Sequence, residues 1–213
     1  MDEIKLTDLQ RDAMQEVSNI GASHAATALS QMVFKDIEIG IPKINIIPIE
    51  DTIECVITEE IAVGIFLKIA DNFPTYILLL LPFDSALNMS AMLMGNQPDP
   101  YKADLDEMEK SAMQEVGNIM MTSFFDSISE LIGLSLVPGP PTVACDMPVA
   151  IMDFIIAQLG EVASKVVVFD IELNDEKNNN FKIDILLMPE PKAIEMILEK
   201  IGMTGVRIIN FFY

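Results

Sequence analysis

The chain has 213 residues and is 51% hydrophobic, which is enough to bury a sizeable core in one or two domains. Its 33 acidic residues against 13 basic ones give a formal net charge of -20 at pH 7. This charge argues against binding to nucleic acid, whose phosphates require Lys and Arg, and against anionic membrane surfaces.

Targeting and metal-binding signals are absent from the sequence. Residues 1–10 are acidic and lack an apolar stretch, so they do not form a signal peptide. The longest apolar run, 76–83, is far too short to span a bilayer. The two cysteines, Cys55 and Cys145, have no metal-ligand spacing, and the lone His24 cannot build a metal site. We therefore expect a cytoplasmic protein with reduced cysteines, no membrane span and no metal or other cofactor of its own.

The first predicted element is a long helix that begins at a capping box in 7–10 and reaches about residue 33. With 3.6 residues per turn, Asp12, Glu16 and Asn19 fall within roughly a 60° arc. A broad apolar stripe lies beside that arc. The helix therefore buries one side and presents the Glu and Asn side chains on another.

The rest of the first half predicts two strands, a hairpin and a helix, over residues 36–41, 44–49, 61–69 with 75–81, and 83–94. Pro42 stops the first strand ladder because proline donates no hydrogen bond. Residues 71–74 form the hairpin turn, and Gly95 ends the helix.

The second half repeats this plan. A helix capped at Asp104 or Asp106 reaches Ile132 and ends at Gly133. The elements predicted after it are strands at 134–137 and 142–147, a helix at 149–159, a hairpin at 162–173 with 181–188, and a helix at 191–201. The apolar tail 205–213 has no counterpart in the first half.

An eight-residue stretch links the halves. The sequence AMQEVSNI at 13–20 returns as AMQEVGNI at 112–119, so seven of eight positions are identical at an offset of 99 residues. The single change is Ser18 to Gly117. Polar residues return as well as apolar ones, including Gln15, which returns as Gln114. Such a repeat indicates an internal duplication.

The repeated pattern extends beyond this stretch. In each half an Asp or Ser precedes the Glu by four residues, and a proline follows the Asn after a gap of twenty-two residues. The positions are Asp12, Glu16, Asn19 and Pro42 in the first half, and Ser111, Glu115, Asn118 and Pro141 in the second.

This doubled pattern resembles the signature of the CheC/CheX/FliY family of chemotaxis phosphatases. The resemblance covers both motifs and, more loosely, nearly the whole chain. It implies an α+β fold with pseudo-two-fold symmetry, in which an antiparallel sheet carries packed helices. We expect a single domain over 1–213, built from repeats at about 7–95 and 104–202 plus the tail.

The Glu and Asn of each motif are suited to assisting hydrolysis of a phosphoryl group that a partner carries. Asn is neither a base nor a nucleophile, but its carboxamide can hold a water in line for attack. Glu lies one turn earlier on the same face and can pair with a lysine of a partner. The chain has no nucleophile set, no phosphate-cradling glycine loop and no metal cluster, one of which a self-contained phosphatase would need. The Glu and Asn pair makes chemical sense if a partner supplies a phosphoaspartate, Mg²⁺ and a lysine, and this is what the resemblance implies.

The resemblance implies that this partner is the phosphorylated response regulator CheY. Glu16 and Glu115 would engage the regulator, and Asn19 and Asn118 would orient the attacking water. The remaining motif residues complete the pattern, and the prolines shape the loop beside each site: Asp12, Pro42, Ser111 and Pro141.

A different class of function stays open beside the enzyme. An isolated Glu-x-x-Asn on a helix is usually a solvated face. The alternative function is a non-enzymatic binding module, because flagellar switch proteins share this fold by resemblance and relatives bind the deamidase CheD. The intact Glu and Asn in both halves favour the phosphatase, and CheD binding can coexist with it.

The two sites differ along the helix line that continues beyond each motif. Ala26 in the first half corresponds to Phe125 in the second. If exposed, Phe125 would act as an aromatic anchor, and the second site would do more of the work. The alternative is that the Phe125 ring turns into the core.

Overall fold

The computed structural model describes residues 8–52, 61–69, 75–133, 135–159, 165–175 and 180–190. The helices in these ranges are α1 (Asp8–Val33), η1 (Ile49–Asp51, 3-10), α3 (Phe83–Leu93), α4 (Glu107–Ile132) and α5 (Pro148–Leu159). The strands are β1 (Ile37–Ile39), β2 (Lys43–Pro48), β3 (Ala62–Ile69), β4 (Thr75–Pro82), β5 (Thr142–Asp146), β6 (Lys165–Asp175) and β7 (Asn180–Pro189). The described strands form one antiparallel sheet with helices packed on it, which confirms the predicted α+β class.

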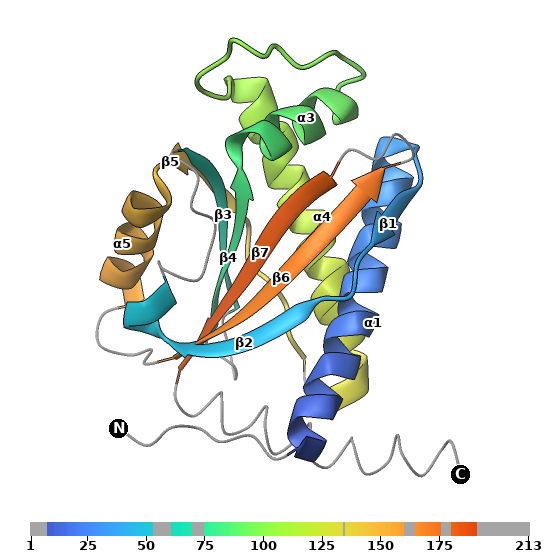
Figure 1. The fold of residues 1–213 in the computed structure, drawn as a ribbon, viewed down its shortest axis with the longest axis vertical. Coiled ribbons are helices and arrows are strands. Elements are labelled where there is room, and N and C mark those ends of the chain that lie inside the picture. The colour runs from blue at the N-terminus through green and yellow to red at the C-terminus, as the bar shows by residue number, and fades with distance from the viewer. Residues whose placement is uncertain are drawn as a thin grey trace.

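The sheet interleaves the two halves of the chain. Its order is β1-β6-β7-β4-β3-β5, and β2 also pairs with β6 (Figure 1). The hairpin strands β4 and β7, one from each half, meet at the centre. At the edges, β1 and β2 of the first half pair with β6 of the second, while β5 of the second half pairs with β3 of the first. Each half therefore supplies an edge strand to the hairpin of the other.

Helices cover one face of the sheet and part of the other, which explains the near-continuous apolar sequence of the central strand β4. Side chains alternate across a strand, so Ile77, Leu79 and Leu81 of β4 join the core that contains α1, α3 and α4. Leu78 and Leu80 point the other way, into a smaller core with α5. All five of these β4 side chains are fully buried. The apolar run at 76–83 is therefore a central strand running into the start of α3.

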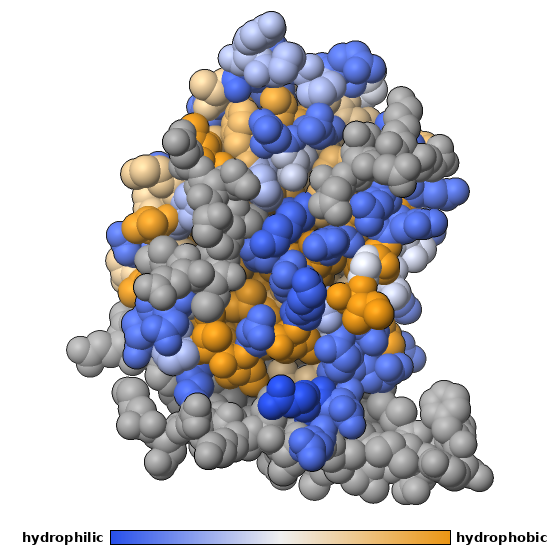
Figure 2. Space-filling model, viewed as in Figure 1, coloured by the Kyte–Doolittle hydropathy of each residue, from blue (hydrophilic) through white to orange (hydrophobic). Residues whose placement is uncertain are grey.

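The face opposite α4 is polar over its middle, with hydrophobic side chains below that region (Figure 2). Hydrophilic side chains gather over the middle of this face, where β6 and β7 run in front of α4 (Figures 1 and 2). Lys43 lies 3.9 Å from Asp170, and Lys182 lies 3.9 Å from Asp184. Apolar burial on this face is concentrated beneath α5. No helix in the described ranges is long and apolar enough to cross a membrane.

The predicted helices and hairpins that fall in the described ranges are confirmed, with small shifts at their ends. The predicted strand at 134–137 is wrong. Residues 135–137 lie outside any strand, and Pro138 alone forms a bridge, to Ile69. The cause is the run of prolines at 138, 140 and 141, which cannot donate to a ladder. The capping residue Thr7, the turn at 71–74, the helix at 191–201, the tail at 205–213 and Cys55 lie outside the described residues.

The two long helices end in the same left-handed backbone conformation but with different residues. Gly133 follows α4 with φ 66°, and Phe34 follows α1 with φ 54°. A left-handed backbone suits glycine, whereas a side chain as bulky as Phe is strained there. The Phe34 side chain is also 94% exposed, so core packing does not offset this strain.

Replacing Phe34 should therefore stabilise the protein. We expect Phe34→Gly to raise the free energy of unfolding by about 0.5–1 kcal/mol, because strain relief exceeds the added entropy of the unfolded chain. Chemical denaturation measures this difference. The matched control is Gly133→Ala, which should destabilise by about 1 kcal/mol although its new methyl group meets no atom within 4 Å. A less stable Phe34→Gly protein would contradict this account.

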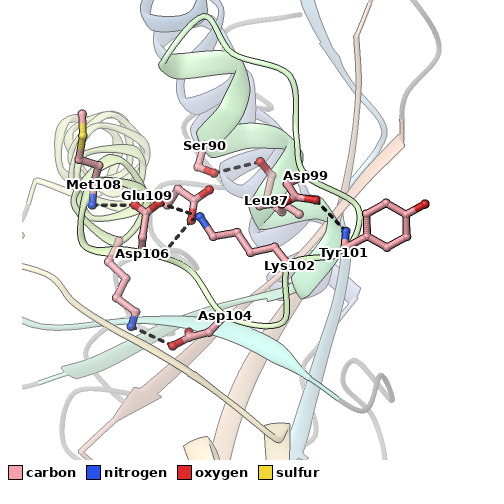
Figure 3. Close-up of polar contacts among 10 residues, drawn as sticks. Leu87, Ser90, Asp99, Tyr101, Lys102, Asp104, Asp106, Met108 and Glu109 are labelled. Carbon is pink, nitrogen blue, oxygen red and sulfur yellow. Dashed lines mark hydrogen bonds and ion pairs between the residues drawn. The ribbon is translucent and has the colours of Figure 1, made fainter.

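A polar cluster fixes the start of α4, the helix that carries the second motif. The Asp106 side chain accepts hydrogen bonds from the backbone N–H groups of Met108 and Glu109, each at 3.0 Å (Figure 3). The buried Glu109 side chain accepts one from the Asp106 N–H, at 2.7 Å, which completes a capping box. Lys102 of the preceding linker pairs with both carboxylates. The hydrogen bond that Asp106 accepts from Lys102, together with the one from the Glu109 N–H, holds the pKa of Asp106 below its usual value.

The lowered pKa gives the Asp106 charge a defined pH dependence. Its stabilising contribution is present above the unfolded pKa of about 3.9 and is lost as pH falls through the lower folded pKa. Asn is also a good N-cap but carries no charge. We therefore expect Asp106→Asn to lower the melting temperature at pH 7, with a deficit that shrinks below about pH 4. Thermal melts between pH 2 and 7 measure it, and a constant deficit would contradict the assignment.

Candidate functional site

Both motif helices present the Glu and Asn of their motif on an outward side. On α1, Ala13 and Val17 are buried in the core while Glu16 is exposed and Asn19 is half-buried. On α4, the Glu115 and Asn118 side chains are both exposed. The residues four positions before each Glu, Asp12 and Ser111, are exposed as well. All four Glu and Asn side chains are therefore accessible to some degree, and the first Asn is the more sheltered.

A β-bulge interrupts the segment that follows each motif helix, between β1 and β2 in the first half and between Pro138 and β5 in the second. Ile39 pairs with Leu173 and Lys43 pairs with Asp170. The segment from β1 to β2 therefore advances four residues while β6 advances three. The second half repeats this arrangement against β3, where Pro138 bridges Ile69 and Thr142 pairs with Phe66. One extra residue is inserted in each half, next to the motif prolines. Bulges of this kind commonly adjoin functional sites, where they redirect backbone groups.

The bulge gives the motif prolines a structural role. Gln15 Nε2 donates a hydrogen bond to the Pro42 carbonyl at 2.7 Å, and Gln114 Nε2 donates one to the Pro141 carbonyl at 3.3 Å. Each proline carbonyl lies where the ladder is interrupted and is turned toward the motif helix. The two prolines thus fix the loop to the helix turn that carries the Glu and Asn.

The sequence analysis assigned no role to Gln15 and Gln114. The signal that could have identified them was their return at an offset of 99 residues together with the Glu and Asn. Gln15 makes a second contact that has no counterpart between Gln114 and Asn118: its Nε2 also donates to Asn19 Oδ1, at 3.2 Å. Gln15 and Asn19 are half-buried, whereas Gln114 and Asn118 are exposed.

The helix line that continues beyond each motif is buried at Ala26 and at Phe125, so the expectation of an exposed Phe125 is wrong and the alternative, a buried ring, is confirmed. Ala26 is 3% exposed and Phe125 is 2% exposed, so neither side chain is available to a partner. The Phe125 ring packs edge-on against Phe124, with 5.4 Å between the ring centroids. Farther along, Ser30 and Ser129 bind the chain that follows, accepting hydrogen bonds from the N–H groups of Ile37 and Leu136. An exposed aromatic anchor at Phe125 is therefore ruled out as a source of inequality between the sites.

Packing explains the one residue that changes in the repeated stretch. A Cβ atom placed on Gly117 would lie 2.5 Å from Ile65 Cγ2, so α4 needs glycine to approach β3 this closely. Ser18 occupies the equivalent place in α1 and is fully buried. The change from Ser18 to Gly117 thus reflects packing beneath the helix, on the side away from the exposed Glu.

His24 lies apart from the motif residues. It lines a cleft of about 400 Å³ between α1 and α4, whose walls come from equivalent positions of the two helices. The lining contains none of the motif Glu or Asn residues: His24, Thr27, Ala28, Gln31, Ser123, Asp126, Ser127 and Glu130. Among the described residues, no group of three or more His, Cys, Asp or Glu side chains could hold a metal ion.

Comparison with known proteins identifies relatives of both motif regions. The model of the CheC-like family matches residues 9–46 and 108–144. The chain is 28% identical over 197 residues to the CheY-P phosphatase CheC of Bacillus subtilis (strain 168), an alignment that covers 91% of this chain and 94% of that protein.

Solved structures show the same fold. The crystal structure of Thermotoga maritima FliY superposes with a TM-score of 0.78 at 22% identity and covers 94% of this chain and 100% of that one. The FliM middle domain from H. pylori superposes with a TM-score of 0.69 at 12% identity, covering 92% and 99%. One stretch in each half of the chain matches the CheC-like family, and the resemblance expected from the doubled motif is therefore confirmed.

Proposed function

We propose that this protein is a phosphatase that accelerates hydrolysis of the phosphoaspartate on the response regulator CheY. The observation that carries the proposal is the outward display of the same Glu and Asn pair on α1 and on α4, each backed by a Gln that binds a bulge carbonyl. The alignment with a CheY-P phosphatase over 91% of the chain supports the reaction.

In this mechanism the carboxamides of Asn19 and Asn118 orient a water for attack. The water oxygen forms a bond to phosphorus as the bond from phosphorus to the aspartyl oxygen breaks. The products are inorganic phosphate and a free Asp carboxylate on CheY. A carboxamide both donates and accepts hydrogen bonds, so it can fix the direction of the water without taking its proton. Phosphoryl transfer depends mainly on such positioning.

Glu16 and Glu115 have a docking role in the proposal. Each lies one helical turn before its Asn, so a cation on CheY that pairs with the Glu also sets the distance between the Asn and the phosphoryl group. Asp12 and Ser111 flank this surface one turn earlier. The Mg²⁺ required by the reaction is held by CheY in this proposal.

The alternative, a non-enzymatic binding module, predicts a different outcome in the same assay. Such a module would bind phosphorylated CheY, or CheD, without speeding phosphate release. CheD binding stays a prediction beside the phosphatase activity, and cytoplasmic location stays one as well.

The two asparagines are expected to carry turnover together. Asn19→Ala combined with Asn118→Ala should lower the rate of phosphate release from phosphorylated CheY by about 10²–10³, the typical loss for one well-placed polar group. The fold should persist, because neither side chain is in the core. Phosphate release followed over time, with circular dichroism as a folding check, measures both effects.

The matched control changes His24→Ala and Ser123→Ala, equivalent positions in the cleft between the helices. This pair should leave phosphate release unaltered. A folded Asn double variant with full activity would exclude the water-orienting role.

A further inference from the structure

We propose that Gln15 is a positioning residue that holds the Asn19 carboxamide ready, and that the first site is consequently the more preorganised of the two. The proposal rests on the function proposed above and identifies a difference between its two sites. It is carried by three hydrogen bonds, two in the first half and one in the second.

The Gln15 amide bridges two acceptors. One Nε2 proton is directed to the Pro42 carbonyl, at 2.7 Å, and the other to Asn19 Oδ1, at 3.2 Å. An amide nitrogen has two protons, so these contacts use its full donor capacity. The bulge anchors one side of Gln15, and the remaining donor faces Asn19 one turn along the helix.

This contact fixes which end of Asn19 faces outward. Oδ1 accepts from Gln15, and the Asn19 Nδ2 group makes no hydrogen bond to the described residues. The group thus stays available to a ligand in a fixed orientation. Groups held in this way need no reorganisation when they bind a reacting water, which is the physical basis of preorganised catalysis.

The second site lacks this bridge. Gln114 reaches the Pro141 carbonyl at 3.3 Å, longer than the 2.7 Å in the first half, and no hydrogen bond joins it to Asn118. Both side chains are exposed there, whereas Gln15 and Asn19 are half-buried. Asn118 must therefore be ordered when CheY binds, and that ordering has an entropic cost. The expected inequality favours the first site, whereas an exposed Phe125 would have favoured the second.

The kinetic test isolates the first site by placing Asn118→Ala in every protein. In that background, Gln15→Met keeps the length of the side chain but removes both donated bonds. We expect kcat for phosphate release to fall about five- to tenfold, the effect of one net hydrogen bond, while KM for phosphorylated CheY stays constant. Unaltered kcat, or a rise in KM alone, would overturn the proposal, since Gln15 would then contribute nothing or would contact CheY directly.

A double-mutant cycle tests whether Gln15 acts through Asn19. A chain carrying Gln15→Met and Asn19→Ala should be no slower than one carrying Asn19→Ala alone. Additive losses would overturn the proposal. The matched variant, Gln114→Met in an Asn19→Ala background, should lower kcat by a smaller factor than Gln15→Met does.

A second readout does not depend on phosphatase activity. Nuclear magnetic relaxation of the side-chain NH₂ groups in the free protein should give a higher order parameter for Asn19 than for Asn118. In Gln15→Met the Asn19 value should fall to that of Asn118. Equal values in the unaltered protein would overturn the proposal, even if the chain dephosphorylates CheY. If the order parameters differ as expected but the combined Asn19→Ala and Asn118→Ala variant releases phosphate at the full rate, the proposed function fails, while the contact from Gln15 still orders the Asn19 side chain.

Discussion

The exchange of edge strands between the halves is the constraint on which the rest of this structure depends. The β1 and β2 strands find their hydrogen-bonding partner in the second half, and β5 finds its partner in the first. An isolated hairpin is marginal in water, so neither β3–β4 nor β6–β7 is expected to persist without the strand that the other half supplies. The central pairing of β4 with β7 then makes one sheet with one main core.

This exchange also determines how the site is built. Each exchanged segment starts beside the end of its motif helix, crosses a bulge, and then runs along the hairpin of the other half. The bulge leaves the Pro42 or Pro141 carbonyl directed toward the helix, and the motif Gln binds it. The four motif positions are separated in the sequence, but in the structure a helix turn and a bulge bring them together. The Glu and Asn lie on the outward side of this unit. The position of the motif Glu and Asn therefore depends on backbone pairing made by the opposite half.

Much of the secondary structure could be predicted from the sequence, because the residues that start, end or bury an element lie close together in the chain. The acidic cap of α4, expected at Asp104 or Asp106, the glycine stop at Gly133 and the apolar strand that contains Leu78 each depend on a few neighbouring residues. Other features depend on distant partners. Phe125 lies on the same arc as the motif of α4, and only the packing of α4 against other elements shows that its ring is buried. The contact from Gln15 to Asn19 depends on a bulge carbonyl twenty-seven positions away from Gln15.

The central claim is that these helix faces meet the phosphorylation site of CheY. A crystal structure of the protein bound to CheY carrying Mg²⁺ and the phosphoryl mimic beryllium trifluoride tests it most directly. The account predicts that the carboxamide of Asn19 or Asn118 lies within hydrogen-bond distance of the position from which water attacks, and that the preceding Glu pairs with a cation of CheY. A complex in which the CheY phosphorylation site faces away from both α1 and α4 would contradict the account.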